Sequence, residues 1–281
     1  MRSNVAVAVL VSMTAAAAAD APAPPSPAAV ARVLDAQKAA MLRDEGNDDE
    51  IKRVLVTNAL ISIQHDLMTP YSIDLAKPVV GWTGACGWVA VEATIRARTH
   101  PEMQADGAPP VQPPRRWHWL ELVEADGSAY LTPALALYAT SPDSALGNGL
   151  YNDIKDLPTE PVPSQLTGWL GNPAEAAKHL AADPAVTVYG TSADDRAVGP
   201  AAAKQLLASW SKLKLDVVTA KPKSTDHEHH ELAVGDCRVA SAYVRMRYQD
   251  GALLLRGFAI AHQTAAGLEL VALAYATDSV Y

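Results

Sequence analysis

The stretch Cys237–Thr277 reads CRVASAYVRMRYQDGALLLRGFAIAHQTAAGLELVALAYAT. In its first part every second residue is apolar, and the residues between them are of mixed polarity. This two-residue period is typical of a strand that packs one face against a core. Gln249-Asp250-Gly251 and Ala265-Ala266-Gly267 each end in glycine and are typical of tight turns between strands. The stretch therefore predicts three antiparallel strands: Cys237–Tyr248, Ala252–His262 and Leu268–Thr277.

The same pattern occurs earlier in the chain. Gly84-Ala85-Cys86 corresponds to Gly235-Asp236-Cys237, and the alternation that follows each cysteine has the same phase. Two further strands are expected after the earlier cysteine, at Trp117–Glu124 and Tyr130–Thr140, with an insertion at His100–Pro114. The chain is therefore predicted to hold two copies of one unit.

Helical segments precede the strands of each predicted copy. They begin at helix-opening pairs or capping residues: Ser26-Pro27, Asn47 with Glu50, Asn172-Pro173 and Gly199-Pro200. The third segment is predicted to run to about Ala182. The last is predicted to bury an apolar stripe made of Leu206, Trp210 and Leu213.

Helices followed by antiparallel strands indicate an α+β fold, in which a curved sheet wraps around helices. The prediction is two tandem cone-shaped domains, at 28–142 and 163–281, joined by a linker at 143–162. The linker region is rich in proline, glycine, aspartate and asparagine, the residues that favour turns and loops. A cone of this kind encloses an apolar pocket, which is a usual place for a ligand.

The N-terminus is typical of a cleavable secretory signal peptide at 1–19. Arg2 precedes an apolar run from Val5 to Met13, and small residues up to Ala19 suit a signal peptidase. A membrane anchor is the alternative, but this run is shorter than the roughly 18 apolar residues that a span needs. We expect a proline-rich leader at 20–27 and a mature protein that is periplasmic or secreted.

The charge of the chain restricts its partners. The formal net charge is -8, and no basic stripe is present. This argues against binding to nucleic acid and, after signal cleavage, against association with an anionic membrane. The sequence also lacks a dinucleotide fingerprint, a P-loop, a G-x-S-x-G and a C-x-x-C, so we expect no cofactor.

One segment carries a resemblance to a known family. Asp183–Ala203 reads DPAVTVYGTSADDRAVGPAAA, in which a strand ending in Gly190-Thr191 leads through acidic residues to Gly199 at the start of a helix. This resembles SnoaL-like domains of the nuclear transport factor 2-like superfamily, and so do the three long strands that follow. The resemblance covers 163–281 well, and 28–142 mainly through the internal repeat. It implies a cone-shaped fold, and a family that includes isomerases, cyclases, dehydratases and domains without known activity.

Six polar residues are candidates to line the pockets of the predicted cones: Asp194, Asp195, His262 and Glu269 in the second copy, and His118 and Glu121 in the first. A buried histidine beside a carboxylate suits proton transfer at a carbon acid. The alternative for each residue is a place at a strand edge or on the surface. The resemblance marks no catalytic residue among them.

The run Asp226–Glu231, DHEHHE, is dense in imidazoles and carboxylates. Groups of this kind bind zinc, nickel or copper, and His227, His229 and His230 are the candidate ligands. The run does not match H-E-x-x-H, and a comparison of the two copies places it in an insertion between strands. We therefore interpret it as a solvated loop and assign no metal site.

Cys86 and Cys237 are the two cysteines of the sequence, and export would allow a disulfide between them. Both lie on the strand face that carries Trp88 and Glu92 in the first copy, opposite the inner apolar face of Val89 and Val91. In the superfamily that the chain resembles, this outer face is commonly where two domains pack sheet to sheet. The hypothesis is an internal pseudo-dimer that brings Cys86 to Cys237. Two separate buried thiols are the alternative.

Three functions remain open. The leading expectation is an exported, noncatalytic tandem SnoaL-like protein that binds a small apolar or amphipathic molecule. The second is a cofactor-free enzyme of isomerase, dehydratase or cyclase type that uses a pocket histidine and carboxylate. The third is a noncatalytic interaction scaffold whose pockets are filled by side chains. Pocket volume would separate the third function from the others, and a paired histidine and carboxylate at the pocket floor would favour the second.

Overall fold

The computed structural model describes residues 23–42, 68–99, 110–111, 114–123, 129–130, 164–191, 194–218, 230–247 and 252–277. The predicted signal peptide at 1–19, the linker at 143–162 and the capping box at Asn47 and Glu50 lie outside these residues. Within the described parts of the chain, no helix combines the length and the apolar character that crossing a membrane requires.

A first sheet is built from residues 68 to 130. Its strands are β1 (Met68–Leu75), β2 (Val79–Thr83), β3 (Cys86–Thr99), β4 (Arg115–Val123) and β5 (Ala129–Tyr130). They run in the antiparallel order β1-β3-β4-β5, and β2 pairs with the start of β3. The strands predicted after Cys86 and near Trp117–Glu124 are present. Of the strand predicted at Tyr130–Thr140, only Tyr130 lies among the described residues.

Helix α1 (Pro27–Leu42) covers one face of the first sheet. Its start is as predicted, because the Ser26 Oγ accepts a hydrogen bond from the Ala29 backbone N–H at 3.2 Å and so satisfies one free amide of the first turn. Alternate residues of β3 point toward this helix. We call this side the inner face of the first sheet, and its apolar cluster includes Val30, Leu34, Val89, Val91, Ala93 and Ile95.

A second, larger sheet is built from residues 187 to 277. Its strands are β6 (Thr187–Tyr189), β7 (Arg196–Val198), β8 (Lys214–Val218), β9 (His230–Val234), β10 (Cys237–Arg247), β11 (Ala252–Thr264) and β12 (Gly267–Thr277). The order is β7-β6-β12-β11-β10-β8, with β9 also on β10. Strand β6 is parallel to β12, and the other pairs are antiparallel. The three long predicted strands are therefore present as β10, β11 and β12.

Three short helices accompany the second sheet: α5 (Gln165–Gly171), α6 (Pro173–Ala176) and α7 (Pro200–Trp210). The sequence predicted a helix from Pro173 to about Ala182, and this length is wrong. Helix α6 ends at Ala176 because the chain then turns back to the sheet. There the Leu270 N–H donates to the His179 carbonyl at 2.6 Å, and the Ala181 N–H donates to the Leu270 carbonyl at 2.9 Å.

Helix α7 begins at Pro200 as predicted, but its buried side differs from the predicted stripe. Leu206 is only partly buried, and Leu213 lies beyond the end of the helix with 38% of its surface exposed. The predicted stripe included Leu213, but the helix ends at Trp210. The residues that the helix buries are Ala203, Leu207 and Trp210.

The inner face of the second sheet carries helix α5. An added side chain at Gly257 would meet Leu170 of α5 and Val244 of β10. The strand register places Ala242 and Tyr275 on the same face as Gly257. The Tyr275 hydroxyl donates a hydrogen bond to the Leu170 carbonyl at 2.7 Å, which fixes α5 to the sheet.

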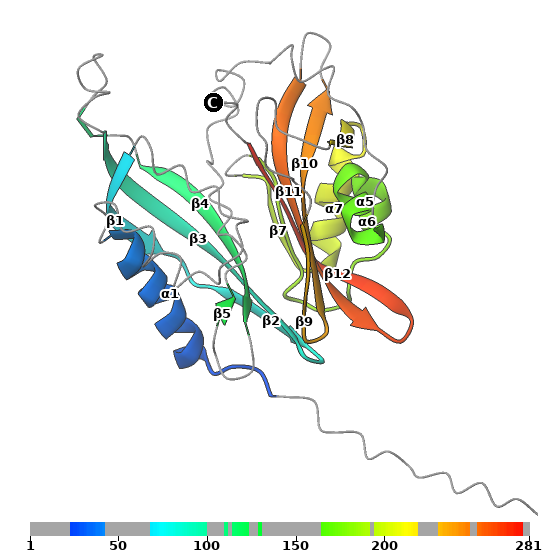
Figure 1. Ribbon diagram of the computed structural model, residues 1–281, viewed down its shortest axis with the longest axis horizontal. Coiled ribbons are helices and arrows are strands. Elements are labelled where there is room, and N and C mark those ends of the chain that lie inside the picture. Colours follow the sequence, from blue (N-terminus) through cyan, green and yellow to red (C-terminus); the bar gives the residue numbers. More distant parts are fainter. Residues whose placement is uncertain are drawn as a thin grey trace, which may run out of the picture.

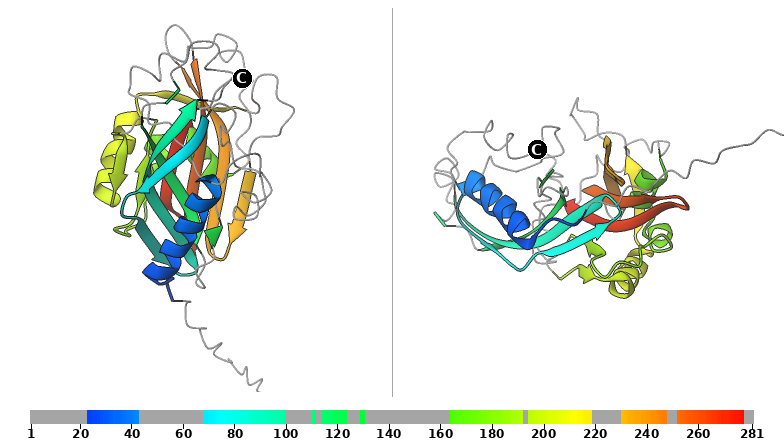
Figure 2. Two further views of the ribbon diagram at one scale, coloured as in Figure 1. Left: turned by 90° about the vertical axis from the view of Figure 1, so that its left-hand side faces the viewer. Right: turned by 90° about the horizontal axis from the view of Figure 1, so that it is seen from below.

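The two sheets lie between the helices, with α1 along the first sheet and α5 to α7 along the second (Figures 1 and 2). The sheet faces that point away from these helices meet each other, and the Trp88 indole N–H donates to the Ala185 carbonyl at 3.1 Å. We call this contact the sheet interface. It comprises Cys86, Trp88, Glu92 and His118 on the first sheet, against Ala185, Tyr189, Arg196 and Cys237.

A disulfide joins the sheets at one end of this interface. It links Cys86 to Cys237, whose Cα atoms are 4.6 Å apart and whose separation in the sequence is 151 residues. The described chain is thus an α+β structure with few helices and large sheets. Its arrangement as two tandem cones stays a prediction.

Candidate functional site

A buried polar cluster lies in the sheet interface and begins with Glu92 and His118. The two residues are directly opposite each other in the register of β3 and β4. The His118 Nε2 is 3.7 Å from the Glu92 Oε2, and the His118 side chain is fully buried whereas Glu92 keeps 21% of its surface exposed. The pair is therefore reached from solvent through its carboxylate.

The second sheet completes the cluster with Tyr189 and Arg196, which face each other across β6 and β7. The His118 ring stacks on the Tyr189 ring, with a centroid separation of 4.1 Å and an interplanar angle of 23°. The Arg196 Nη1 lies 3.7 Å from the Glu92 Oε2, and both side chains of this ion pair are partly exposed, unlike the His118 ring. Four strands from two sheets thus contribute one side chain each.

Burial sets the protonation states of this cluster. It lowers the pKa of His118 to about 4 from 6.5, because an imidazolium loses its hydration there; Glu92 opposes the shift, and Arg196 adds to it. Burial also raises the pKa of Tyr189 to about 12. At neutral pH both rings are uncharged. Within the described residues, the His118 Nδ1 and the Tyr189 hydroxyl have no hydrogen-bond partner.

These protonation states limit what the cluster can do chemically. A general base works best when its pKa is near the working pH, and the imidazole of His118 falls well below it. The phenol of Tyr189 is equally far from ionisation at neutral pH. The cluster is suited to holding a neutral, stacked contact between the sheets, and its charge changes in acid.

His118 and Glu121, the two candidates of the first predicted copy, do not lie together. Both are fully buried, but the alternation of β4 sends them to opposite faces of the first sheet. His118 lies in the sheet interface, whereas Glu121 shares the inner face with Trp119. The histidine and the carboxylate therefore cannot act on one substrate from these positions.

The four candidates of the second sheet are also dispersed. His262 and Glu269 are register partners on β11 and β12. His262 is partly buried near Gly84, whereas Glu269 is exposed. Asp194 is exposed at the β6–β7 connection, and Asp195 is partly buried beside Gly190. His262 is the register partner of Cys237 and so lies on the face of the sheet interface. Asp195, in contrast, lies near Trp210, whose ring packs against Tyr275 of the inner face.

Close packing explains why the Val188–Thr191 segment has a glycine at position 190. A Cβ at Gly190 would lie 2.5 Å from the Cβ of Asp195 and 2.5 Å from the Cζ2 of Trp210, which is closer than atoms can approach. The Gly190 N–H also donates to the Asp195 carbonyl at 2.7 Å. The glycine therefore allows the β6–β7 hairpin to close over α7.

The histidine run lies largely outside the described residues. His227 and His229 are not described, and His230 begins strand β9, where the sequence predicted a loop. Pairing with Ser241 of β10 extends the strand to this position. The Glu231 carboxylate accepts a hydrogen bond from the Thr167 hydroxyl at 2.8 Å. The described residues contain no group of three or more metal-binding side chains.

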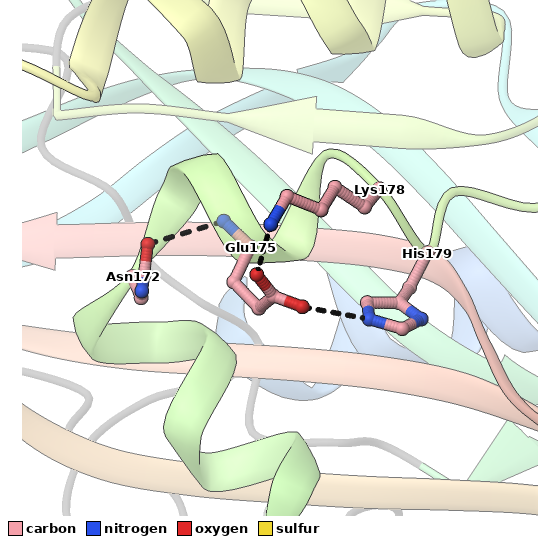
Figure 3. Close-up of polar contacts among 4 residues, drawn as sticks. All are labelled: Asn172, Glu175, Lys178 and His179. Carbon is pink, nitrogen blue, oxygen red and sulfur yellow. Dashed lines mark hydrogen bonds and ion pairs between the residues drawn. The ribbon is translucent and has the colours of Figure 1, made fainter.

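A second polar cluster lies on the surface around α6 (Figure 3). The Asn172 Oδ1 accepts from the Glu175 N–H at 3.1 Å and caps the helix. The Glu175 carboxylate binds the Lys178 Nζ at 2.6 Å and the His179 Nε2 at 3.1 Å. The His179 ring stacks on Trp169 at 4.8 Å. This cluster fastens the α6 turn to α5, which is a structural role.

The turns beside the disulfide also hold the two sheets together. The Ala85 N–H donates to the Asp236 carboxylate at 2.8 Å, across the interface. Gly84 and Gly235 have φ angles of 57° and 55°, in the left-handed region that favours glycine. A Cβ at Gly235 would lie 2.5 Å from the Ala85 carbonyl oxygen. These glycines therefore let the two turns approach closely.

The chain has low sequence identity to the known proteins that it resembles, and its structure is only weakly similar to theirs. No protein-family model matches the chain, and no curated protein matches its sequence. Among solved structures, an NTF2-like protein of unknown function from Pseudomonas putida KT2440 is 9% identical, with a TM-score of 0.30, over 37% of this chain and 71% of its own.

Two further solved structures are similar to part of the chain. A hypothetical protein with a ketosteroid isomerase-like fold from Catenulispora acidiphila, in complex with trimethylamine, is 13% identical, with a TM-score of 0.31, over 43% of this chain and 91% of its own. A DUF4783 family protein from Bacteroides uniformis is 13% identical, with a TM-score of 0.30, over 42% of this chain and 98% of its own.

Three members of the buried cluster, Glu92, Tyr189 and Arg196, were not among the candidates that the sequence suggested. Glu92 was placed on the outer strand face with the cysteines, and that alternation was the available signal for it. Tyr189 and Arg196 belong to the segment that carries the family resemblance, but the pairing of β6 with β7 and the contact with the first sheet were not foreseen. The cluster depends on contacts between strands that are far apart in the sequence.

Proposed function

We propose that the protein is an exported, noncatalytic interaction scaffold of the nuclear transport factor 2-like superfamily, whose two predicted copies form an internal pseudo-dimer. The segment Val188–Thr191, the parallel pairing of β6 with β12 and the long strands β10 to β12 support the superfamily. The signal peptide prediction supports export. The role as a scaffold rests on how the inner face of the second sheet is filled.

The packing at Gly257 carries this proposal. A single added Cβ at this residue would lie 2.9 Å from the Val244 Cγ2 and 3.3 Å from the Leu170 Cδ2. An added methyl group would therefore force Val244 to shift and would press against Leu170, because α5 packs directly on the sheet at this point. A cone that holds a small molecule needs free volume under its helix.

The burial of neighbouring inner-face residues agrees with this view. A chamber wide enough for a small molecule would leave part of its lining accessible to water. The inner-face residues around Gly257 are instead almost completely buried: Ala242, Val244, Leu255, Ala259, Leu273 and Tyr275. Their own side chains fill the space in which a ligand would lie.

The enzyme alternative is not favoured by the position of the histidine and carboxylate pair. Glu92 and His118 lie in the sheet interface, away from either inner face. The lowered pKa of His118, about 4, makes it a weak base at neutral pH. We therefore propose a role without catalysis.

Binding of a small amphipathic molecule remains a second candidate because of one observation on the first sheet. Among the described residues, α1 is the helix that covers its inner face, through Val30 and Leu34. The packing argument at Gly257 concerns the second sheet alone, so a ligand under α1 is tested separately.

Gly257→Ala tests the closed inner face. If the face is filled, Val244 and Leu170 have no space into which to shift, and the added methyl group lowers the free energy of unfolding by about 1–3 kcal/mol. Urea denaturation measures this loss. Ala233→Val, at an exposed position of β9, is the matched control and should change little. Unchanged stability of Gly257→Ala would mean that the inner face has free volume, which contradicts the scaffold.

Native mass spectrometry of the unreduced protein, purified from its own compartment, separates the two candidates. The scaffold predicts a bare polypeptide that starts at Asp20 and is lighter by two hydrogens because of the disulfide. A small molecule that is lost on denaturation would contradict the scaffold and support ligand binding. A chain that still begins at Met1 would contradict export.

A further inference from the structure

The sheet interface is held in two different ways along β3. A covalent bond between Cys86 and Cys237 closes one end. Further along the strand, the Trp88 indole N–H donates to the Ala185 carbonyl. The interface then reaches Glu92 and His118, where the contact with the second sheet depends on ring stacking and on an ion pair.

His118 is surrounded by few groups that could stabilise a positive charge. Glu92 of β3 is the carboxylate that faces it, at 3.7 Å. Arg116 of β4 and Arg196 of β7 both disfavour its protonation, and Tyr189 of β6 covers its ring as a neutral phenol. A proton on His118 would therefore place a buried cation near two arginines and one carboxylate.

We propose that the sheet interface is an acid-sensitive latch: protonation of His118 releases the β6–β7 hairpin from β3 and β4, while the Cys86–Cys237 disulfide keeps the two sheets joined. The released state lets water and counter-ions reach the imidazolium, which removes the cost of its burial. The disulfide makes the opening local and reversible. This inference holds whether or not the protein binds a ligand.

The size of the effect follows from the two protonation equilibria. His118 has a pKa of about 4 in the closed interface, and an ordinary value of 6.5 applies once it is exposed. The open state therefore gains protons as the pH falls from neutral. The equilibrium constant for opening rises about 20-fold between pH 7 and pH 5.

Hydrogen exchange of the intact, oxidised protein tests the latch. Exchange is followed by mass spectrometry at pH 7 and pH 5, with correction for the intrinsic pH dependence of amide exchange. Amides of β6 and β7, which lose the cover of the first sheet, are expected to show an opening that is about 20-fold more frequent at pH 5. Amides of β4, which stay paired with β3, and amides of β11 should keep their protection. Equal protection of β6 and β7 at the two pH values would overturn the proposal.

His118→Gln and His179→Gln form the matched pair of variants. Both histidines stack on an aromatic ring and lie beside a glutamate, but only His118 is in the sheet interface. His118→Gln should abolish the acid-dependent opening, and His179→Gln should retain it. The same 20-fold increase in His118→Gln would overturn the assignment of the latch to this residue.

Glu92→Gln and Arg196→Gln test the same idea if His118→Gln does not fold. Glu92 favours the protonated imidazole and Arg196 disfavours it. In an NMR titration of His118, Glu92→Gln should therefore move the midpoint to lower pH and Arg196→Gln to higher pH. A merely structural weakening of the interface would move both midpoints in the same direction, and this result would contradict the latch.

Discussion

Two clusters in this molecule combine a glutamate, a histidine and an aromatic ring, yet they behave differently. In the sheet interface, His118 is 3.7 Å from Glu92 and stacks on Tyr189. On the surface, His179 is 3.1 Å from Glu175 and stacks on Trp169. The His118 side chain is fully buried, whereas 31% of the His179 side chain is exposed.

The degree of burial determines whether the histidine or the glutamate of each cluster has the shifted pKa. In the interface, burial lowers the pKa of His118, and the nearby carboxylate does not compensate for the lost hydration. On the surface, hydrogen bonds from Lys178 and then from His179 lower the pKa of Glu175. The same residue types therefore give a histidine that stays neutral in the buried cluster, and a glutamate that ionises more readily in the surface cluster.

Removal of each histidine ring should give the largest difference between the clusters. His118→Ala leaves a cavity between two packed sheets, and we expect a loss of about 2–4 kcal/mol in the free energy of unfolding. His179→Ala removes a ring that water already reaches, and its loss should be clearly smaller. Urea denaturation at pH 7 measures both. Equal losses would show that burial does not distinguish the clusters.

The pH dependence of stability should follow the buried histidine. The folded pKa of His118, about 4, is below the ordinary value of 6.5, so the unfolded chain binds more protons between these values. This contribution to stability is complete above pH 6.5 and is lost as the pH falls to 4, by at most about 3 kcal/mol.

Denaturation curves between pH 7 and pH 4 provide the measurement for this prediction. His118→Gln should flatten the curve of stability against pH, whereas His179→Gln should leave its slope in place. A wild-type slope that persists unchanged in His118→Gln would assign the acid sensitivity to other groups.

The surface cluster should contribute mainly through its helix cap. Asn172→Ala removes the acceptor of the Glu175 N–H, and the expected cost is about 1 kcal/mol. Asn172→Asp keeps an acceptor at the same position and serves as the control. If alanine and aspartate give equal stability in thermal or urea denaturation, the cap does not stabilise α6.

The hydroxyl of Tyr189 should give the smallest effect. It is buried and has no hydrogen-bond partner within the described residues. Tyr189→Phe should therefore change stability by less than about 0.5 kcal/mol, or increase it. Tyr275→Phe is the matched comparison, because it breaks the bond to the Leu170 carbonyl, at a cost of about 1 kcal/mol. A larger loss in Tyr189→Phe would reveal a partner for this hydroxyl.

Strand patterns in the sequence predicted the faces of the sheets well. The alternation after Cys86 and after Cys237 placed Val89 and Val91 on one side and Glu92 on the other, as the structure has them. Periodicity suffices for this because successive side chains of a strand point to opposite faces. The start of α1 at Ser26 was predicted for a similarly local reason.

Contacts between distant segments could not be predicted in the same way. The opposition of Glu92 and His118 depends on the register of β3 and β4, across the insertion at His100–Pro114. The end of α6 at Ala176 depends on hydrogen bonds to Leu270, far along the chain. The strand period also separates residues three positions apart, which is why the candidates His118 and Glu121 lie on opposite faces of the first sheet.

The disulfide between Cys86 and Cys237 closes a covalent ring over the segment between these two residues, which are 151 positions apart in the sequence. A protease that cuts once between these cysteines opens the ring but releases no fragment. The cleaved molecule would migrate as one species on a non-reducing gel and as two after reduction. The protein can therefore be nicked in the segment between its two sheets and still remain a single molecule, provided that its surroundings are oxidising.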